Sequence, residues 1–600
     1  MRPPAVNSAV VFQVRAADLR AHLYEIRCRL DAPDRDGQIF RMPGWLRGSY
    51  LVRDFAKHVT QIRAQAGDRP LPFERLDKRS LRVAPSDGPI ELIYTVYAFD
   101  ESVRKAWLDT RRGFFNGSSL FYCPAGREHA TFEVELLPPD DALAARWRVA
   151  TSLSAVAIDA RGFGRYRADG YEALIDHPVE LADFQRVDFD VDGIPHALVL
   201  SGRAETDLPR LARDLGRICH VEREMFGQQP KLDQYLFLTN VVANGYGGLE
   251  HRDSTALICS RGDLPRVGDD KLNRDYRTFL GLCSHEYFHL WNVKRITAAK
   301  FLESDLGAEA YTRDLWHYEG VTSYYDDLFL LRAGVLDAAS YLDLVSENAT
   351  RLERSPARKQ QTLADASFDT WIKYYQPDEN TPNTAVSYYV KGALAALCLD
   401  LILRRDSHCT LDDVMRAAWA RWGATGIGVP EGGLEALAQE LSGLDLRAFF
   451  DTALRSTDDL PLAELLNDFG VRAQRRPAVS ELDAGGWVSG DAPRTWAGLK
   501  LRGGDTRVQH VYSDGPALRA GISANDQLVA IDGLRVTAGN WPARLAALQA
   551  GQRYPLQLFR NDELLTVEFE PCAPPADTWT MTLVDADPAI AARRKAWIGA

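Results

Sequence analysis

Alternation of apolar and polar positions dominates the first 185 residues. Residues 21–28, 90–97 and 130–136 alternate in this way and are rich in β-branched and aromatic side chains. Because successive side chains of a strand point to opposite faces of a sheet, the pattern predicts antiparallel strands with one buried face. We therefore expect an all-β N-terminal domain over residues 1–185.

The middle of the chain mixes two periodicities. A helical rhythm over 208–226 is followed by a strand-like run at 235–240 and by a glycine-rich stretch at 245–251. From residue 308 to about 450, helical patterns dominate, as in 312–331 and 387–404. We expect a small sheet with a helical continuation, divided into a domain over 186–350 and a helical part over 351–475.

After Leu460-Pro461 the pattern changes to short strands separated by glycines. Gly515-Pro516 introduces a short helix of small residues, and Ile531-Asp532-Gly533 marks a later turn. In this order the features resemble a PDZ domain, which we assign to 488–575, leaving a C-terminal tail at 576–600. The segment 498–501 resembles the carboxylate-binding loop and peptide-pairing strand of such domains, so a C-terminal peptide is a possible partner.

Composition narrows the class of protein. The chain has 600 residues, 46% hydrophobic and 26% charged, as expected for a multidomain globular protein. Its net charge of −12 argues against nucleic acid or an anionic membrane as the main partner. No apolar run long enough for a transmembrane helix and no secretory signal after Met1-Arg2-Pro3-Pro4 are expected. Eight scattered cysteines predict buried thiols, and a cytoplasmic location is our default expectation.

The strongest chemical signal is a His-Glu-x-x-His motif formed by His285, Glu286 and His289. Helical positions four residues apart share one face, so the two imidazoles can bind one metal ion. The glutamate between them is placed to accept a proton from a water molecule that the ion activates. The motif predicts a hydrolytic metal centre, although two histidines on an ordinary amphipathic helix would look the same.

A third protein ligand is needed for a catalytic zinc site. Several downstream residues have a suitable side chain: Glu303, Asp305, Glu309, Asp314, His317 and Glu319. Glu319 stands out because Gly320, Thr322 and Tyr324 follow it within a helical pattern that could pack on the first helix.

Together these motifs resemble a known family. A glutamate followed by Gly-x-Thr-x-Tyr, after His-Glu-x-x-His, resembles the third-ligand segment of the gluzincin metallopeptidases. The sequence from His285 to Arg295, the upstream stretch 44–55 and the PDZ-like end resemble more narrowly the glycyl aminopeptidase family. The resemblance implies a multidomain α+β fold with a thermolysin-like catalytic domain, and one Zn²⁺ ion bound by His285, His289 and Glu319.

The spacing departs from the better-known broad-specificity aminopeptidases. Here 29 residues, from Leu290 to Tyr318, separate the second histidine from the glutamate, which is a longer connection than in those enzymes. A longer loop costs little closure entropy, so Glu319 remains the predicted ligand, with Glu309 and Glu303 as alternatives.

Two further sequence segments contain the remaining residues of the predicted site. Tyr389, in a Tyr-x-Lys-Gly segment, resembles the residue that stabilises the oxyanion in related aminopeptidases, with Tyr388 as its competitor. Gly247, Gly248 and Glu250 resemble the edge-strand motif that pairs with substrate and holds its free ammonium. A fixed carboxylate at that place favours exopeptidase activity, because a free N-terminal amine satisfies a desolvated negative charge.

Three functional hypotheses follow. The first is a zinc aminopeptidase that releases small N-terminal residues such as glycine and alanine, acting on peptides with a free N-terminus. The second is a zinc endopeptidase that recruits substrates through its PDZ domain. The third is a PDZ binding protein whose hydrolase domain has decayed. The sequence does not decide the oligomeric state, or whether cobalt or manganese replaces zinc.

Overall fold

The computed structural model describes residues 9–600, so Met1–Pro4, on which the expectation of no secretory signal depended, lie outside the described residues. The chain divides into two compact units, each described here by itself. One unit comprises Met1–Ala310 and Trp419–Val429, and the other comprises Tyr311–Ala418 and Pro430–Ala600.

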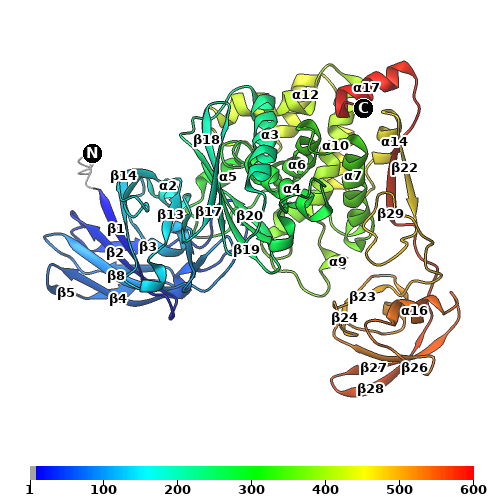
Figure 1. Ribbon diagram of the computed structural model, residues 1–600, viewed down its shortest axis with the longest axis horizontal. Coiled ribbons are helices and arrows are strands. Elements are labelled where there is room, and N and C mark those ends of the chain that lie inside the picture. The colour runs from blue at the N-terminus through cyan, green and yellow to red at the C-terminus, as the bar shows by residue number, and fades with distance from the viewer. Residues whose placement is uncertain (1–8) are drawn as a thin grey trace. The chain divides into compact units, whose positions relative to one another are not determined.

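The first unit begins with the predicted β domain (Figure 1). Within the described residues, its largest sheet has eight strands in the order β14-β15-β12-β1-β2-β8-β4-β5. Its outer strands are β14 (Ser154–Ile158), β15 (Gly164–Asp169), β4 (Val59–Ala66) and β5 (Arg69–Leu71). The central strands alternate between buried and more exposed positions, which is why the sequence pattern could identify them. Their bounds are Val10–Asp18 for β1, Leu23–Leu30 for β2, Ile90–Tyr97 for β8 and Thr131–Leu137 for β12. A short helix near the domain's end, α2 (Tyr171–Ile175), carries Asp176 as its C-cap.

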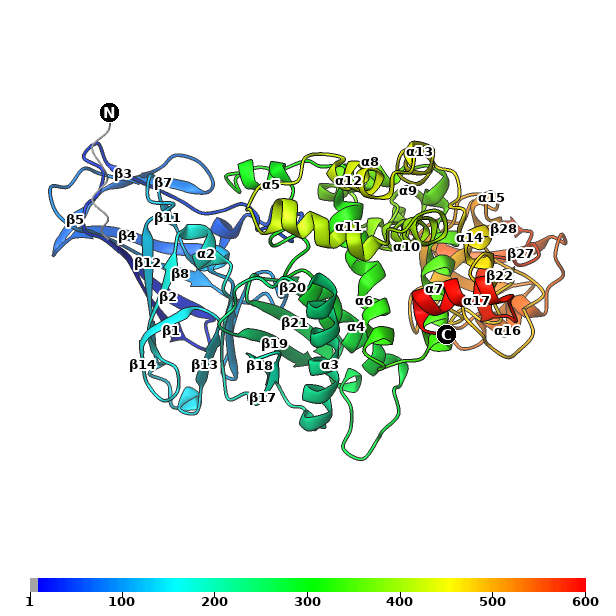
Figure 2. The ribbon, with the colours of Figure 1, turned by 90° about the horizontal axis from the view of Figure 1, so that it is seen from above.

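A five-stranded sheet follows, in the order β17-β18-β19-β21-β20 among the described strands. Its helices α3 (Leu208–Phe226) and α4 (Arg274–Phe288) pack against each other and contact the sheet (Figure 2). Strand β20 (Tyr246–Glu250) lies at the edge, antiparallel to β21 (Ser254–Ser260). The remaining strands are β17 (Gln185–Val191), β18 (Ile194–Ser201) and β19 (Tyr235–Val242). The sheet therefore presents the glycine-rich strand at its rim.

Helices make up the beginning of the second unit. Helix α10 (Tyr388–Asp406) packs on α6 (Val321–Arg332), on α7 (Ala338–Glu353) and on a π-helical turn, Trp316–Gly320. By length and composition, Thr381–Asp406 could cross a membrane, but 83% of its most apolar window is buried inside the protein. The sequence predicts no transmembrane helix because no uninterrupted run of about 18 apolar residues occurs, and here Lys391 and Asp400 interrupt the apolar positions.

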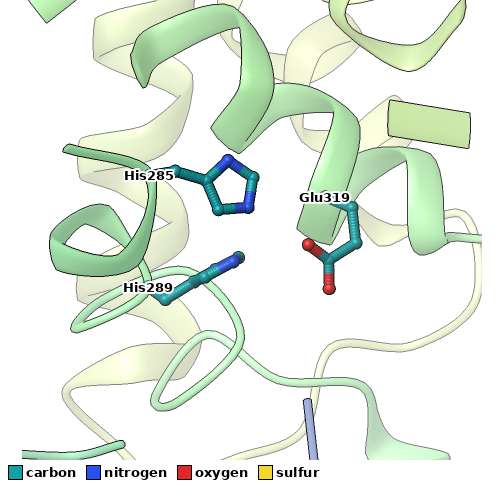
Figure 3. A group of neighbouring side chains, drawn as sticks. All are labelled: His285, His289 and Glu319. Atoms are coloured by element: carbon teal, nitrogen blue, oxygen red, sulfur yellow. The ribbon is translucent and has the colours of Figure 1, made fainter. Parts of the chain in front are cut away.

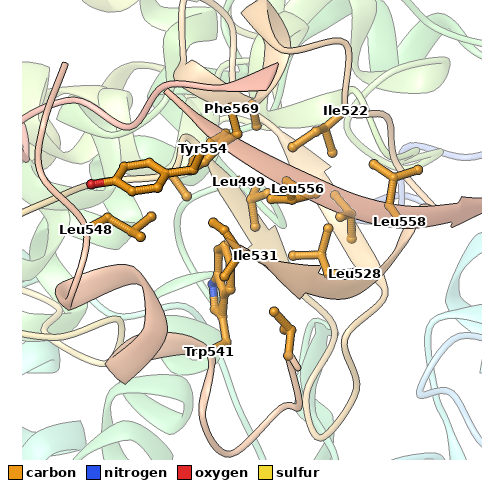
Figure 4. Packing of buried hydrophobic residues seen from close by; sticks show 14 residues of the cluster. Leu499, Ile522, Leu528, Ile531, Trp541, Leu548, Tyr554, Leu556, Leu558 and Phe569 are labelled. Atoms are coloured by element: carbon orange, nitrogen blue, oxygen red, sulfur yellow. The ribbon is translucent and has the colours of Figure 1, made fainter. Parts of the chain in front are cut away.

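The PDZ-like segment forms its own hydrophobic core. Strands β25 (Gln527–Ile531), β27 (Tyr554–Arg560) and β28 (Glu563–Phe569) surround buried side chains such as Leu528, Trp541 and Leu556 (Figure 4). Strand β23 (Leu499–Leu501) pairs with β24 (Val508–Val511), and α16 spans Trp541–Ala546.

The segment predicted as a C-terminal tail carries regular structure. Strand β29 (Thr578–Leu583) pairs antiparallel with β22 (Val471–Arg476), and α17 spans Pro588–Ile598. The PDZ-like segment is thus inserted between two strands that pair with each other. The sequence does not predict this pairing. The strands are short, their apolar residues are isolated, and the two strands lie about 100 residues apart in the chain.

Candidate metal centre and substrate site

The His-Glu-x-x-His motif occupies the last turn of α4. Asn273 caps the helix start by accepting a hydrogen bond from the backbone N–H of Tyr276, at 2.8 Å. The helix ends at Phe288, and His289 follows as its C-cap with helical backbone angles. Glu286 and His289 are buried, and His285 is half-buried. The motif side chains are therefore held on a capped helix that is packed in the core.

The predicted ligands lie together. The ligand atoms of His285, His289 and Glu319 are all within 4.8 Å of one another, and both imidazoles face the carboxylate (Figure 3). The Nδ1 atom of His289 donates to the carbonyl of Asn292 at 2.9 Å, so Nε2 is the nitrogen that would bind a metal ion. Two imidazoles and one carboxylate suit a catalytic zinc ion that keeps one position open.

Glu319 lies in the π-helical turn Trp316–Gly320, a local geometry that often occurs at functional sites. The turn is packed closely on α10, because a Cβ at Gly320 would be 2.5 Å from the Cα of Gly392. The alternative ligands Glu303 and Glu309 are exposed, and neither belongs to a metal-binding group among the described residues.

Glu286 lies against the edge strand. A Cβ on Gly248 would overlap the Oε1 atom of Glu286, so only glycine leaves the carboxylate its place. Thr255 Oγ1 approaches the other carboxylate oxygen at 3.5 Å. Gly247 and Gly248 both lie in β20, as predicted for the strand that would pair with substrate. Arg104 donates to the carbonyl of Gly248 at 3.2 Å.

Glu250 ends β20 next to this carboxylate. Ligand atoms of Glu250, Glu286 and His289 lie within 4.8 Å of one another. The Glu250 side chain is 4% exposed, and its Oε1 atom has no hydrogen-bond partner among the described residues. A buried carboxylate oxygen is costly without a cation or a donor, so this atom suits a positively charged or donor group from outside the described residues.

The position of Glu250 depends on a second glycine. A Cβ on Gly48, whose φ of +94° also favours glycine, would overlap the carboxylate of Glu250. Gly48 belongs to the N-terminal signature 44–55, but its role could not be seen in sequence because it is about 200 residues from Glu250.

Tyr389 and Tyr388 lie at the start of α10 and point to different partners. The Tyr389 hydroxyl is 3.2 Å from that of Tyr375, and the Tyr388 hydroxyl is 2.9 Å from Thr370 Oγ1. Burial and the carboxylate of Glu319 raise the pKa of Tyr389 well above its usual value. The Tyr389 phenol therefore keeps its proton at neutral pH and can donate a hydrogen bond.

His251, the residue after Glu250, is fully buried, and its Nδ1 atom forms a hydrogen bond with Asp176 Oδ1 at 3.2 Å. Burial lowers its pKa.

Family models match most of the chain. The Peptidase M61 N-terminal domain matches residues 11–183, the M61 glycyl aminopeptidase domain matches 278–395, and a PDZ domain matches 492–570. A solved structure of an aminopeptidase N family protein from Idiomarina loihiensis is 38% identical, with a TM-score of 0.94. That similarity covers 98% of this chain and 100% of the other.

The chain belongs to the M61 glycyl aminopeptidase family. It is a metallopeptidase, and the predicted family and the α+β fold with a C-terminal PDZ domain are confirmed. A solved structure of an M1 zinc metallopeptidase mutant from Deinococcus radiodurans is 14% identical to this chain, with a TM-score of 0.50. The similarity covers 76% of this M61 chain and 95% of that chain, and it shows that the two folds are similar. Comparison with curated proteins gave no match.

Proposed function

We propose that this M61 peptidase is an aminopeptidase that uses one zinc ion and prefers peptides with glycine or alanine at a free N-terminus. One observation carries the proposal: Glu250 has a buried carboxylate oxygen with no hydrogen-bond partner within residues 9–600, beside Glu286 and His289. An ammonium group supplies the positive charge and the donors that this atom lacks. The preference for small residues is supported by the family description alone.

The chain's own residues account for each proposed step. When bound by His285, His289 and Glu319, zinc supplies an activated water molecule and polarises the scissile carbonyl. Glu286 accepts a proton from that water and returns it to the departing amine. Tyr389 donates a hydrogen bond to the carbonyl oxygen as negative charge develops there. Glu250 binds the substrate ammonium, which fixes the register at the first peptide bond.

The edge strand would bind the substrate backbone. Strand β20 lies at the rim of its sheet, and its two glycines allow an extended peptide to approach closely. Similarly, β23 of the PDZ domain pairs only with β24 among the described strands, which supports a C-terminal peptide as a second ligand. A cytoplasmic location remains part of the proposal and suits the eight free cysteines.

Activity on paired substrates tests the proposal. Glycine, alanine and leucine anilides should be hydrolysed in that order of preference, and N-acetylation of the glycine anilide should abolish cleavage. A chelator should remove the activity, and zinc should restore it. The substitution Glu286→Gln should lower kcat by about 10²–10⁴-fold, the range for loss of a general base.

The substitution Glu250→Gln separates the exopeptidase from the endopeptidase. We expect it to raise KM for free-amine substrates, because the ammonium loses its charged partner. Equal cleavage of blocked and free peptides would instead establish an endopeptidase. Purified protein without stoichiometric metal and without activity on any of these substrates would identify a PDZ binding protein.

A further inference from the structure

We propose that Asp176, which the N-terminal β domain contributes, is a positioning residue that holds both the loop supporting His289 and the end of the strand carrying Glu250. The inference rests on the proposed function, because it assigns those two residues to metal and amine binding. The hydrogen bonds that Asp176 accepts within the described residues come from Lys294, His251 and Arg252.

Asp176 accepts hydrogen bonds from three groups in two segments. Its Oδ1 atom accepts from Lys294 Nζ at 2.6 Å and from His251 Nδ1 at 3.2 Å, and its Oδ2 atom accepts from the backbone N–H of Arg252 at 3.0 Å. The side chain is 15% exposed and that of Lys294 is 6% exposed. Burial opposes ionisation of Asp176, but Lys294 and His251 outweigh it and hold its pKa well below the usual range.

The bond to Lys294 leads to the metal site. Asn292, two residues before Lys294, provides the carbonyl that accepts from His289 Nδ1. Val293 between them has a φ of +82°, a left-handed conformation that is strained for a β-branched residue. A strained loop keeps its conformation only when its surroundings hold it. The buried Lys294–Asp176 pair provides that restraint and so fixes the ring of His289.

The bonds to His251 and Arg252 lead to the amine site. Both residues directly follow Glu250 at the end of β20. The backbone N–H of His251 also donates to the Ser254 carbonyl at 2.9 Å, which closes the turn into β21. Asp176 binds this turn at a side chain and at a backbone group. It therefore holds the end of β20 in place and so fixes the orientation of the Glu250 carboxylate.

A matched control lies in the same cleft. Asp176, Lys294, Glu172 and Arg47 line one cleft of the first unit. Glu172 forms two bonds of 2.8 Å with Arg47, but its side chain is 59% exposed and bonds neither Lys294 nor His251 in the described structure. Glu172→Gln therefore removes a carboxylate and an ion pair from this place and leaves the hydrogen bonds of Asp176 to both segments intact.

The experiment measures zinc affinity and substrate affinity separately in the full chain. Zinc affinity is measured by competition with a chelator, and KM is measured with glycine anilide. We expect Asp176→Asn to weaken zinc binding by about 10–100-fold, the usual effect of losing an outer-shell partner, and to raise KM about tenfold. Lys294→Gln should weaken mainly zinc binding, His251→Gln should raise mainly KM, and Glu172→Gln should change each by less than about twofold.

Asp176 is only structural if Asp176→Asn lowers the melting temperature while zinc affinity and KM stay within twofold of the unmodified protein. If that variant does not fold, Lys294→Gln and His251→Gln decide, and unchanged zinc affinity in the first with unchanged KM in the second overturns the proposal. Failure of the proposed function is a different result. The unmodified protein would then hydrolyse no free-amine substrate. The zinc affinities of the variants would still test whether the Asp176–Lys294 bond positions His289.

Discussion

At the residue scale, Gly248 reserves the space that the proposed general base occupies. The substitution Gly248→Ala adds a methyl group where Oε1 of Glu286 lies, and the strand backbone leaves little freedom to move it. We expect kcat to fall at least tenfold while the fold is retained, because the displaced carboxylate no longer reaches the water molecule it must deprotonate. Steady-state kinetics and circular dichroism measure the two effects.

A matched control is Gly262→Ala, because a Cβ there meets no atom within 4 Å. Its kcat should equal that of the unmodified protein. Unchanged kcat in Gly248→Ala would show that Glu286 adopts another productive position, and the proposed role of this glycine would be rejected.

Some residues of the candidate site could be predicted from the sequence, and others could not. His285, Glu286 and His289 lie within one helical turn and a half, so their relation follows from local geometry. Glu319 and Glu250 were selected by family resemblance. Gly48 and Asp176 act on segments about 75 to 200 residues away, so their roles depend on tertiary contacts that no local pattern encodes.

At the element scale, a buried carboxylate makes the segment before Glu319 sensitive to pH. Asp314 is buried and accepts a hydrogen bond from the backbone N–H of Gly432 at 2.7 Å. Burial first, and the Glu431 carboxylate second, raise the pKa of Asp314 from 3.8 to about 7. Between these values the native state binds one proton more than the unfolded state. The stabilisation is therefore complete below pH 3.8 and is lost as pH rises through about 7.

We expect Asp314→Asn to remove this dependence, since an amide oxygen can still accept from Gly432 but does not ionise. The difference in unfolding free energy between variant and unmodified protein should change by about 2 kcal/mol, in favour of the variant, from pH 5 to pH 8. Urea denaturation at both pH values measures it. Glu379→Gln, at an exposed position, serves as the control. Parallel curves for Asp314→Asn and unmodified protein would contradict the prediction.

Elements differ in how well their patterns revealed them. Strands of the N-terminal domain alternate over seven to nine residues with one face buried, which makes their period readable. The π-helical turn that contains Glu319 has no such periodic pattern in the sequence. It packs on α10, a contact that a local pattern does not reveal. Strand β29 alternates weakly and takes its register from β22.

At the scale of the whole molecule, the last helix of the second unit, α17, contacts helices α6 and α10. Tyr324 of α6 donates to Asp400 of α10 at 2.6 Å, and Trp597 of α17 donates to the Tyr324 hydroxyl at 3.3 Å. The carbonyl of Ala596 accepts from Arg404 at 2.9 Å. The last helix thus closes a buried network that joins α6, which directly follows Glu319, to α10, which carries Tyr389.

Removing the buried indole should therefore weaken the helical unit as a whole. Trp597 is 3% exposed, and Trp597→Ala leaves a large cavity beside Tyr324, so we expect a loss of about 3–5 kcal/mol in unfolding free energy. Trp487→Ala, at a tryptophan that is 75% exposed, should cost less than about 0.5 kcal/mol. Denaturant unfolding followed by circular dichroism compares the two variants. Equal losses would mean that Trp597 of α17 contributes no more to stability than an exposed surface tryptophan, whereas the expected difference would show that α17 stabilises the helical unit.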